Sequence, residues 1–347
     1  MRKALVTGGT GFVGGHVALA LLDAGWAVRV LARDPSRSAG GLLNGRTVEM
    51  RRGDLGSEEG LEEAARGVDA IVHAAGILKA RSLEDYREVN VRGTERLVAA
   101  AARSAPGARF VLVSSQAAAG PSRGGRPVTE SDPPAPISWY GLSKREGEEA
   151  VSRLWPGPWT ILRPAVVYGP GDRGLLAYFR MAATGIVPVP AGATRIQLIS
   201  AARAALGISR AAAGGALDGR AGFLCDAHPV TVRELASRIA AHSGRKARLV
   251  AVPSTVVRLL GAAETVAERL SGRSRPFNAD KAREILAGDW LCDGRPVETA
   301  LGLPPPKPLD EGLRALWAWY RRAGWLGDGA FSGSAGGRSG GPPSRTL

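Results

Sequence analysis

The chain has 347 residues, of which 44% are hydrophobic and 22% are charged, and these fractions are typical of a globular protein with one large and one smaller domain. No apolar run approaches the roughly 20 residues that a membrane-spanning helix requires, and the first ten residues fit a strand and a loop better than a secretory signal. The formal net charge is +14, but the arginines are dispersed without a block of five or six, so nucleic acid is not expected as a partner.

Two cysteines, Cys225 and Cys292, are too few for a disulfide framework. No CxxC pair and no cluster of cysteine and histidine suggests zinc, so we expect no metal site. This cysteine usage favours a reducing, cytoplasmic compartment.

In chain order, a short apolar strand at residues 3–7 precedes a glycine-rich loop and a helix over 12–24, which Gly25 ends. Two long helices are predicted further on, over 83–103 and 138–153. Further buried strands are predicted at residues 27–32, 47–51, 70–74, 109–114 and 160–164. Apolar strands that alternate with helices predict an α/β protein with a Rossmann-type, doubly wound parallel sheet, here over residues 1–170.

After residue 170 the alternation loosens and helices predominate. Helices are predicted at residues 172–184, 201–213, 232–242, 254–270, 278–286 and 309–323, with strands at 195–199 and 221–225. We expect residues 195–226 to return to the sheet, and residues 171–194 and 227–326 to form a smaller, mostly helical substrate domain. Residues 327–347 are rich in Gly, Ser, Pro and Arg, which predicts a disordered tail.

The first loop, residues 7–14 (TGGTGFVG), has the glycines that a dinucleotide-binding turn requires between a strand and a helix. Gly8 permits the tight turn, Gly11 lets the backbone approach a pyrophosphate, and Gly14 lets the helix pack on the strand. The free N–H groups at the start of the helix would then bind the phosphates. Expected cofactor contacts in this loop are Thr7, Gly8, Gly11, Phe12, Val13 and Gly14.

The residues after the second strand decide between the two nicotinamide cofactors. Arg33 stands where an acidic residue would bind the ribose 2′-hydroxyl, and a guanidinium can pair with a 2′-phosphate instead. Arg37 could assist, whereas Asp34 keeps NAD(H) open, so NADP(H) is the preferred prediction. Residues expected to line the rest of the cofactor are Asp54, Leu55, Ala74, Ala75 and Gly76.

Three further side chains, Ser115, Tyr140 and Lys144, indicate a reaction. Tyr140 and Lys144 are four residues apart on a predicted helix, so they project from the same face. A lysine ammonium beside a phenol favours the phenolate and lowers a pKa that is ordinarily about 10. A serine hydroxyl can hold a substrate oxygen next to the tyrosine, and the three residues together predict hydride transfer at a C–OH/C=O centre.

Five segments, in the correct order, resemble the motifs of the extended short-chain dehydrogenases/reductases, also called the NAD-dependent epimerase/dehydratase family. They are residues 7–14 (TGxxGxxG), 90–94 (NVRGT), 114–120 (SSQAAAG), 140–144 (YxxxK) and 163–171 (RPAVVYGPG). The resemblance covers residues 1–326. In pattern the chain is most similar to 3β-hydroxysteroid dehydrogenases and dihydroflavonol reductases.

The resemblance implies a role for each matching position. Tyr140 would be the acid and base, Lys144 would bind the nicotinamide ribose and lower the phenol pKa, and Ser115 would orient the reacting oxygen. Asn90 would hold the long helix or a water in a proton relay. Further implied cofactor contacts are Tyr140, Lys144, Pro164 and Val167, and expected substrate contacts are Leu78, Gln116, Ala117, Tyr168 and Phe179.

Two features narrow the reaction. Gln116 and Ala117 stand where sugar-nucleotide 4,6-dehydratases carry an acidic pair, which excludes that elimination. Apolar residues at 77–78, 117–121, 165–167 and 175–179 favour a lipophilic ketone or alcohol as substrate. We therefore predict an NADP(H)-preferring oxidoreductase that interconverts a secondary alcohol and a ketone or aldehyde on a small apolar molecule.

Two alternatives stay open. A sugar-nucleotide epimerase with tightly bound NAD needs only the tyrosine, the lysine and room for the sugar to rotate. A non-catalytic dinucleotide-binding assembly subunit or RNA-associated protein would fit the basic charge and residues 200–205 (SAARAA), where relatives often carry His-Val-x-Asp-Leu.

Two kinds of contact surface are also predicted. The family resemblance implies a homodimer through helices 83–103 and 138–153. The amphipathic helix at 254–270 could touch a membrane peripherally, although such a stripe more often packs in a core.

Overall fold

A computed structural model describes residues 1–36, 41–242, 247–272, 275 and 277–326; Arg37 and the tail at 327–347 lie outside the described residues. Seven parallel strands form the main sheet in the order β11-β6-β5-β4-β1-β2-β3. Their bounds are β1 Lys3–Thr7, β2 Ala27–Ala32, β3 Glu49–Arg52, β4 Ala70–His73, β5 Arg109–Val113, β6 Trp159–Pro164 and β11 Arg220–Leu224.

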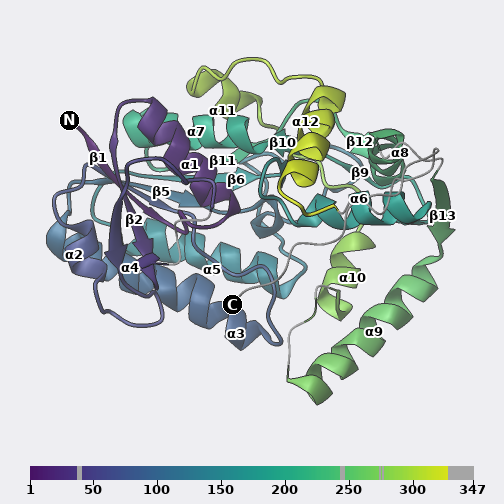
Figure 1. The fold of residues 1–347 in the computed structure, drawn as a ribbon. Helices are drawn as coiled ribbons and strands as arrows, with labels where there is room; N and C mark the ends of the chain where they lie inside the picture. Colours follow the sequence, from purple (N-terminus) through teal and green to yellow (C-terminus); the bar gives the residue numbers. More distant parts are fainter. Residues whose placement is uncertain (37–40, 243–246, 273–274, 276, 327–347) are drawn as a thin grey trace, which may run out of the picture.

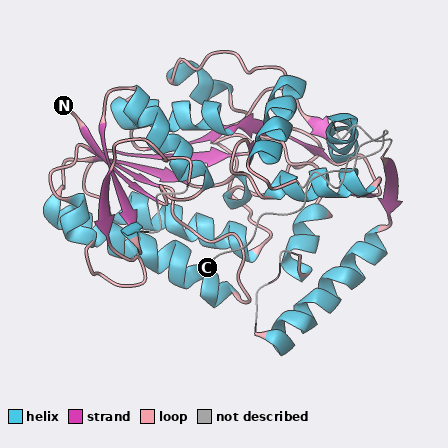
Figure 2. Ribbon diagram, in the orientation of Figure 1, coloured by secondary structure: helices cyan, strands magenta, loops and turns pink. Residues whose placement is uncertain are grey.

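Helices cover both faces of this sheet (Figures 1 and 2). One face packs against α1 (Phe12–Asp23) and α7 (Ala201–Ala213), and the other against α2 (Leu61–Ala65), α4 (Gly93–Ser104) and α5 (Trp139–Leu154). The strands are apolar on both sides because both faces are buried. The predicted doubly wound α/β fold is confirmed. Within the described residues, no helix is both long and apolar enough to cross a bilayer.

The helix predicted at 83–103 is interrupted. It consists of α3 (Leu83–Arg87), one π-helical turn called η2 (Glu88–Arg92) and α4. A π turn is wider than an α turn, and such turns are frequent at functional sites. This turn carries Asn90, whose carbonyl oxygen lies 2.9 Å from where a Cβ at Gly147 of α5 would stand. Because glycine has no Cβ, the widened turn can pack this closely against α5.

A second, smaller core lies beside the sheet (Figure 1). Its elements are α6 (Gly174–Thr184), α8 (Val232–His242), α12 (Leu309–Arg322) and the parallel strand pair β8 (Ile186–Pro190) and β13 (Arg248–Val252). Phe179 is fully buried in this core, where its ring lies 5.6 Å from that of Trp317 and 5.3 Å from that of Tyr320. The structure therefore gives Phe179 a packing position instead of the expected substrate contact.

The strand predicted at 195–199 belongs to two small sheets. Its first part, β9 (Arg195–Ile196), pairs antiparallel with β12 (Val230–Thr231), and its second part, β10 (Leu198–Ser200), pairs parallel with β7 (Val166–Tyr168). Between them, the buried Gln197 side chain donates to the Asp226 carbonyl (3.0 Å) and accepts from the Cys292 N–H (2.6 Å). The remaining elements are η3 (Gln116–Ala118), α9 (Ser254–Ser271), α10 (Ala279–Ile285) and α11 (Arg295–Ala300).

Candidate active site

The glycine-rich loop has the close backbone packing of a phosphate-binding turn. Gly8 has φ +71°, a conformation that favours glycine, and a Cβ there would lie 2.7 Å from the Ala75 nitrogen. A Cβ at Gly14 would overlap the Gly8 carbonyl oxygen, so α1 can start here only without a side chain. In the described chain no side chain caps α1, and its first turn holds no acidic residue. Its N–H groups and positive end are therefore available to an anion.

Two arginines stand together where β2 and β3 end. Arg33 follows Ala32, and Ala32 pairs in register with Arg52 of β3. Both arginines are exposed, and neither forms an ion pair within the described residues. Asp34, in contrast, accepts hydrogen bonds from the N–H and hydroxyl of Ser36, at 3.1 and 2.6 Å, so its carboxylate is engaged in a local turn. Arg52 is not among the predicted site residues, because only the strand register brings it here.

The other predicted cofactor contacts lie in the loops after β3, β4 and β6. Asp54 is exposed and accepts from the Gly56 N–H (3.0 Å), while Leu55 is half-buried. The backbone of Ala74 and Ala75 passes against Gly8, at the sheet edge where the parallel strands end, and Gly76 lies against the Asn90 side chain. Pro164 ends β6 and Val167 lies in β7.

A directed chain of hydrogen bonds connects β1, β4 and α4 through the buried His73. The Thr7 hydroxyl lies 2.6 Å from His73 Nδ1, and the Thr94 hydroxyl lies 2.9 Å from Nε2 and donates to the Asn90 carbonyl (2.8 Å). Because Thr94 has only one proton to donate, it accepts from Nε2–H, and Nδ1 then accepts from Thr7. Burial, and secondly the Lys144 charge, lower the pKa of His73 to about 3, so the ring is neutral.

The Asn90 side chain joins the loop after β4 to α5. Its Oδ1 accepts from the Ile77 N–H (2.9 Å), and its Nδ2 donates to the Ile77 carbonyl (3.2 Å) and to the Ser143 hydroxyl (3.0 Å). Both amide protons are therefore used by protein atoms. This geometry fits the expected role of holding the helix better than a water relay.

The structure brings Ser115, Tyr140 and Lys144 together. The Ser115 hydroxyl accepts from the Ala117 N–H (3.2 Å), and it lies near enough to the Tyr140 phenol to act against the rise of the phenol pKa. Because its oxygen accepts from the Ala117 N–H, its one proton is available to a neighbouring oxygen atom. The Lys144 ammonium is buried and donates to the Val113 carbonyl (2.8 Å).

Burial dominates the acid–base properties of this group. It raises the pKa of Tyr140 to about 12, with Ser115 acting in the opposite direction. It also lowers the pKa of Lys144 to about 8, against the negative charge of Glu148, which raises it. At neutral pH the phenol is therefore protonated and the ammonium charged. The lowered phenol pKa expected from the sequence is not found, since burial of the ring outweighs any effect of the lysine.

A buried ion pair lies one helical turn beyond Lys144. Glu148 accepts from Arg163 of β6 through two hydrogen bonds, of 2.9 and 2.7 Å, and from the Ser114 hydroxyl at 2.6 Å. Both charged side chains are almost fully buried. Tyr140, Lys144 and Glu148 thus share one face of α5. The four-residue spacing after Lys144 could have revealed Glu148 from the sequence.

The helix α10 contacts α5 at the turn that carries Tyr140. The Ser138 hydroxyl accepts from the Gly141 N–H (3.0 Å) and donates to Glu284 (2.5 Å). The Trp139 N–H donates to both carboxylate oxygens of Asp280, each at 3.0 Å. Two carboxylates therefore lie at the positive end of α5, where negative charge is favourable.

The predicted substrate contacts divide into two groups. Gln116 and Ala117 directly follow Ser115 and are buried, and the Gln116 Nε2 has no hydrogen-bond partner within the described chain. Leu78 is 72% exposed in the loop after β4. Tyr168 and Phe179 are buried in the second core, so the structure places them in packing positions away from solvent.

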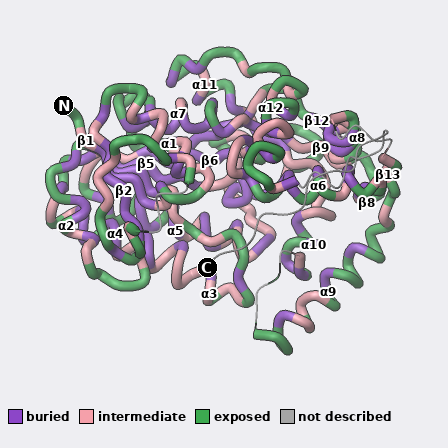
Figure 3. The backbone as a smooth tube through the Cα atoms, in the orientation of Figure 1, coloured by how far each residue is buried: buried purple, intermediate pink, exposed green. Residues whose placement is uncertain are grey.

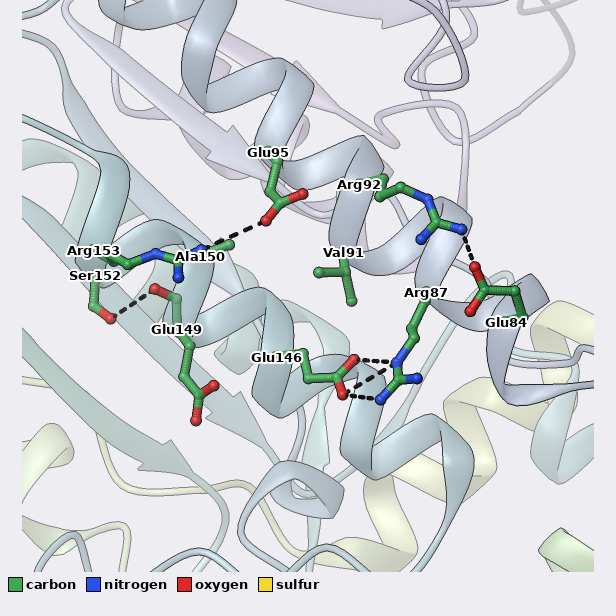
Figure 4. Close-up of a pocket in the computed structure, with 10 residues that line it drawn as sticks. All are labelled: Glu84, Arg87, Val91, Arg92, Glu95, Glu146, Glu149, Ala150, Ser152 and Arg153. Atoms are coloured by element: carbon green, nitrogen blue, oxygen red, sulfur yellow. Dashed lines mark hydrogen bonds and ion pairs between the residues drawn. The ribbon is translucent and has the colours of Figure 1, made fainter.

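A hollow of about 740 Å³ lies on the outer surface of α3, η2, α4 and α5 (Figure 4). Its lining is mostly charged, with Arg87 and Glu146 paired across it at 2.5 Å. None of the four predicted catalytic side chains, Ser115, Tyr140, Lys144 and Asn90, lines it. The homodimer implied for these helices stays a prediction, and an interface here would be polar.

The fold, the phosphate-binding loop and the Ser115–Tyr140–Lys144 group define a dinucleotide-dependent oxidoreductase of the short-chain class. The chain belongs to the NAD dependent epimerase/dehydratase family, whose model matches residues 4–199. The family resemblance seen in the sequence is therefore confirmed.

The relatives of the chain are enzymes. It is 37% identical over 328 residues to a ceramide reductase of Caulobacter vibrioides, covering 92% of this chain and 95% of that protein. It is 30% identical over 340 residues to a 4-hydroxy-2-methyl-3-oxo-4-farnesyl-3,4-dihydroquinoline-1-oxide ketoreductase of Stigmatella aurantiaca, covering 95% and 98%. The structure of UDP-glucose 4-epimerase from Thermotoga maritima has a TM-score of 0.74 at 22% identity, covering 93% and 99%, and shows the shared fold alone. The prediction of an enzyme is confirmed.

The neutral His73 makes stability depend on pH. In the unfolded chain a histidine takes up a proton near pH 6.5, whereas the folded ring does so only near pH 3. Stability should therefore fall as the pH falls through this window, by about 3 kcal/mol at pH 4.5. Urea unfolding should show a flatter pH dependence for His73→Gln, with the exposed His228→Gln as control. Equal slopes for His73→Gln and the wild type would contradict this assignment.

The charge of Glu148 should set the pH at which Lys144 loses its proton. In Glu148→Gln the negative charge that raises the Lys144 pKa is removed, so that pKa should fall below about 8. The alkaline limb of the pH profile of kcat/KM, followed by oxidation of the reduced nicotinamide cofactor, should move to lower pH. Glu149→Gln, at the neighbouring exposed position, is the matched control and should leave the limb in place. If the alkaline limb of kcat/KM stays at the same pH in a folded Glu148→Gln enzyme, Glu148 has only a structural role.

Proposed function

We propose that the chain is an NADP(H)-preferring reductase that interconverts a secondary alcohol and a ketone or aldehyde on a small lipophilic molecule. The observation that carries this proposal is the grouping of Ser115 with the buried Tyr140 phenol, in which the Ser115 oxygen accepts from the Ala117 N–H and its proton is free to be donated. In this grouping the phenol proton can point at a substrate oxygen. A pKa of about 12 keeps that proton on the phenol at neutral pH, which suits donation to a carbonyl during reduction.

Each residue of the group has a distinct task in this proposal. Tyr140 gives its proton to the substrate oxygen in reduction and takes it back in oxidation. Ser115 holds the same oxygen by donating its one hydroxyl proton to it. The Lys144 ammonium adds a positive charge behind the phenol and, by the family resemblance, binds the nicotinamide ribose. Asn90 acts as a positioning residue, because it fixes the loop after β4 against α5.

The residues around the first loop fit a dinucleotide. The glycine positions leave room that a Cβ would fill, and the start of α1 offers N–H groups to a pyrophosphate. When bound, the nicotinamide supplies the hydride and, in its oxidised form, a positive charge. The cofactor contacts stay those predicted from the sequence, from Thr7 to Val167.

Two observations support the preference for NADP(H). Arg33 and Arg52 carry exposed guanidinium groups at the adjacent ends of β2 and β3, without an ion-pair partner in the described chain. Asp34, which would repel a 2′-phosphate, is engaged with Ser36. Guanidinium groups bind phosphate through paired, charge-assisted hydrogen bonds.

We further propose that the substrate carries its ketone on a lipid. The residues expected around it, such as Leu78 and Ala117, are apolar, and Gln116 adds one unpartnered amide beside Ser115. The relative with 37% identity is named a ceramide reductase, and the ketoreductase relative acts, by its name, on a farnesyl compound. A lipophilic ketone fits both the lining and these names better than a nucleotide sugar does. The cytoplasmic location stays a prediction.

A direct assay tests the reaction. Purified enzyme receives NADPH or NADH with ceramide-type, steroid, flavonoid and aliphatic ketones and with UDP- and GDP-sugars, and products are identified by mass spectrometry. We expect NADPH oxidation with a lipophilic ketone. Tyr140→Phe should lower kcat/KM by at least about a hundredfold while still binding the cofactor. Tyr86→Phe, which removes a hydroxyl from the ring 6.1 Å away, should retain most activity. A sugar isomer formed without net cofactor change would establish an epimerase instead.

The two cofactors should respond differently to Arg33. Losing charge-assisted hydrogen bonds in Arg33→Ser should raise the Kd for NADPH by at least about tenfold, with little change for NADH. Calorimetric titration with each cofactor measures the difference. Arg51→Ser is the control, because Arg51 pairs with Glu49 and Glu63 on the other side of β3. An equal loss for both cofactors would mean that Arg33 does not read the 2′-phosphate.

A further inference from the structure

A normal surface helix buries its apolar side and exposes its polar side, whereas helix α9 exposes most of its apolar side. It lies at the margin of the molecule, beside α10, and most of its length is exposed (Figures 1 and 3). Its buried residues are Val257, Gly261 and Glu268. Five of its large apolar side chains face solvent instead, and their exposed fractions run from 41% at Val256 to 84% at Leu270.

The exposed apolar residues form one stripe along the whole helix, which we call the α9 stripe. Its members are Val256, Leu259, Leu260, Val266 and Leu270. With 100° per residue, they fall within a sector about 120° wide. The helix is about 27 Å long, at 1.5 Å per residue for 18 residues. A continuous apolar stripe of this length marks an interaction site.

Two polar residues of α9, Thr265 and Glu268, are turned toward the protein and are hydrogen-bonded there. Glu268 accepts from the Arg275 N–H (2.5 Å) and the Asn278 amide (3.3 Å). The Thr265 hydroxyl accepts from the Ala279 N–H (2.9 Å). A Cβ at Gly261 would lie 2.7 Å from the Ala282 Cβ, which shows how closely α9 and α10 approach. These contacts fix the rotation of the helix, so the α9 stripe cannot turn inward without breaking them.

Positive charge accompanies the stripe. Arg258 and Arg269 are exposed along one margin, and neither has an ion-pair partner among the residues described. The acidic residues of α9 are occupied, since Glu264 pairs with Arg275 (2.7 Å) and Glu268 is buried. The face that α9 presents outward is therefore apolar with a cationic margin.

Two sets of contacts connect α9 to the candidate active site. α10 joins α9 to the turn of α5 that carries Tyr140, through Asp280 and Glu284. The Arg81 guanidinium, in the loop that also carries the exposed Leu78, donates to the Gly272 carbonyl at the end of α9 (3.3 Å). A surface bound to α9 would therefore lie beside the loop that carries a predicted substrate contact.

We propose that α9 binds flat on an anionic lipid bilayer, with the α9 stripe in the acyl-chain boundary and Arg258 and Arg269 at the lipid headgroups. Apolar residues beside exposed cations are typical of helices that lie in a membrane interface. Anionic headgroups attract such cations. A second copy of the chain fits less well, because each copy carries a net charge of +14 and the same arginines would meet. The proposal is independent of which ketone the enzyme reduces.

Vesicle sedimentation tests the proposal with the full chain. Vesicles of phosphatidylcholine alone are compared with vesicles that contain phosphatidylglycerol. We expect binding to the anionic vesicles. The double variant Leu259→Gln/Leu270→Gln should bind at least about tenfold more weakly, because the immersed apolar area is reduced. Arg258→Gln/Arg269→Gln should lose about tenfold on anionic vesicles and little on neutral ones. Leu154→Gln, at an exposed leucine that ends α5, is the matched control.

Two further measurements keep the outcome decisive. NADPH titration and thermal unfolding should be unchanged in both double variants, since these side chains are exposed and outside the candidate site. Turnover of a water-soluble ketone without vesicles should also be unchanged, which separates this proposal from the proposed reaction. The proposal would be overturned if the wild-type protein did not bind anionic vesicles. It would also be overturned if sedimentation velocity without lipid showed a wild-type dimer and a monomer for the leucine variant.

Discussion

The buried ion pair between Glu148 and Arg163 is the interaction on which the candidate site depends. Two charges removed from water are stable only when paired and hydrogen-bonded, and here the Ser114 hydroxyl adds a third contact. Because Glu148 is on α5 and Arg163 on β6, the pair fixes both the rotation and the height of the helix on the sheet. Tyr140 and Lys144, on the same helix face, are held in place by it. Losing one partner would leave an uncompensated charge, at a cost of about 3–5 kcal/mol.

The same helix is held at its other end by the second part of the chain. Asp280 and Glu284 of α10 accept hydrogen bonds at the first turn of α5, next to Tyr140. The negative charge of Glu284 also contributes to the raised pKa of the Tyr140 phenol. A shift of α10 would therefore change both the position and the acidity of the phenol. Helix α10 and the Tyr140 phenol are in this way mechanically and electrostatically coupled.

Local patterns in the sequence predicted the parts of the fold that depend on neighbouring residues. The phosphate-binding loop is determined by glycines within eight positions, and the alternation of strands and helices is likewise local. Features set by distant contacts were missed. The π turn at Asn90 depends on packing against Gly147, and Arg52 reaches the end of β2 only through strand register. The pair of β8 and β13 joins segments about 60 residues apart, and the two prolines of β8 conceal its strand pattern.

Helix α9 shows what a periodic sequence pattern cannot predict. The sequence pattern at 254–270 identifies an apolar stripe but says nothing about which side faces the protein. The deciding contacts come from α10, where Gly261 allows close approach and Thr265 and Glu268 find backbone partners. Those contacts satisfy buried polar groups that would otherwise be unpaired. They therefore determine the rotation of α9 about its axis, even though burial of the leucines would favour the opposite rotation. The leucines are exposed because of this rotation, and in the proposed complex a lipid surface would bury them.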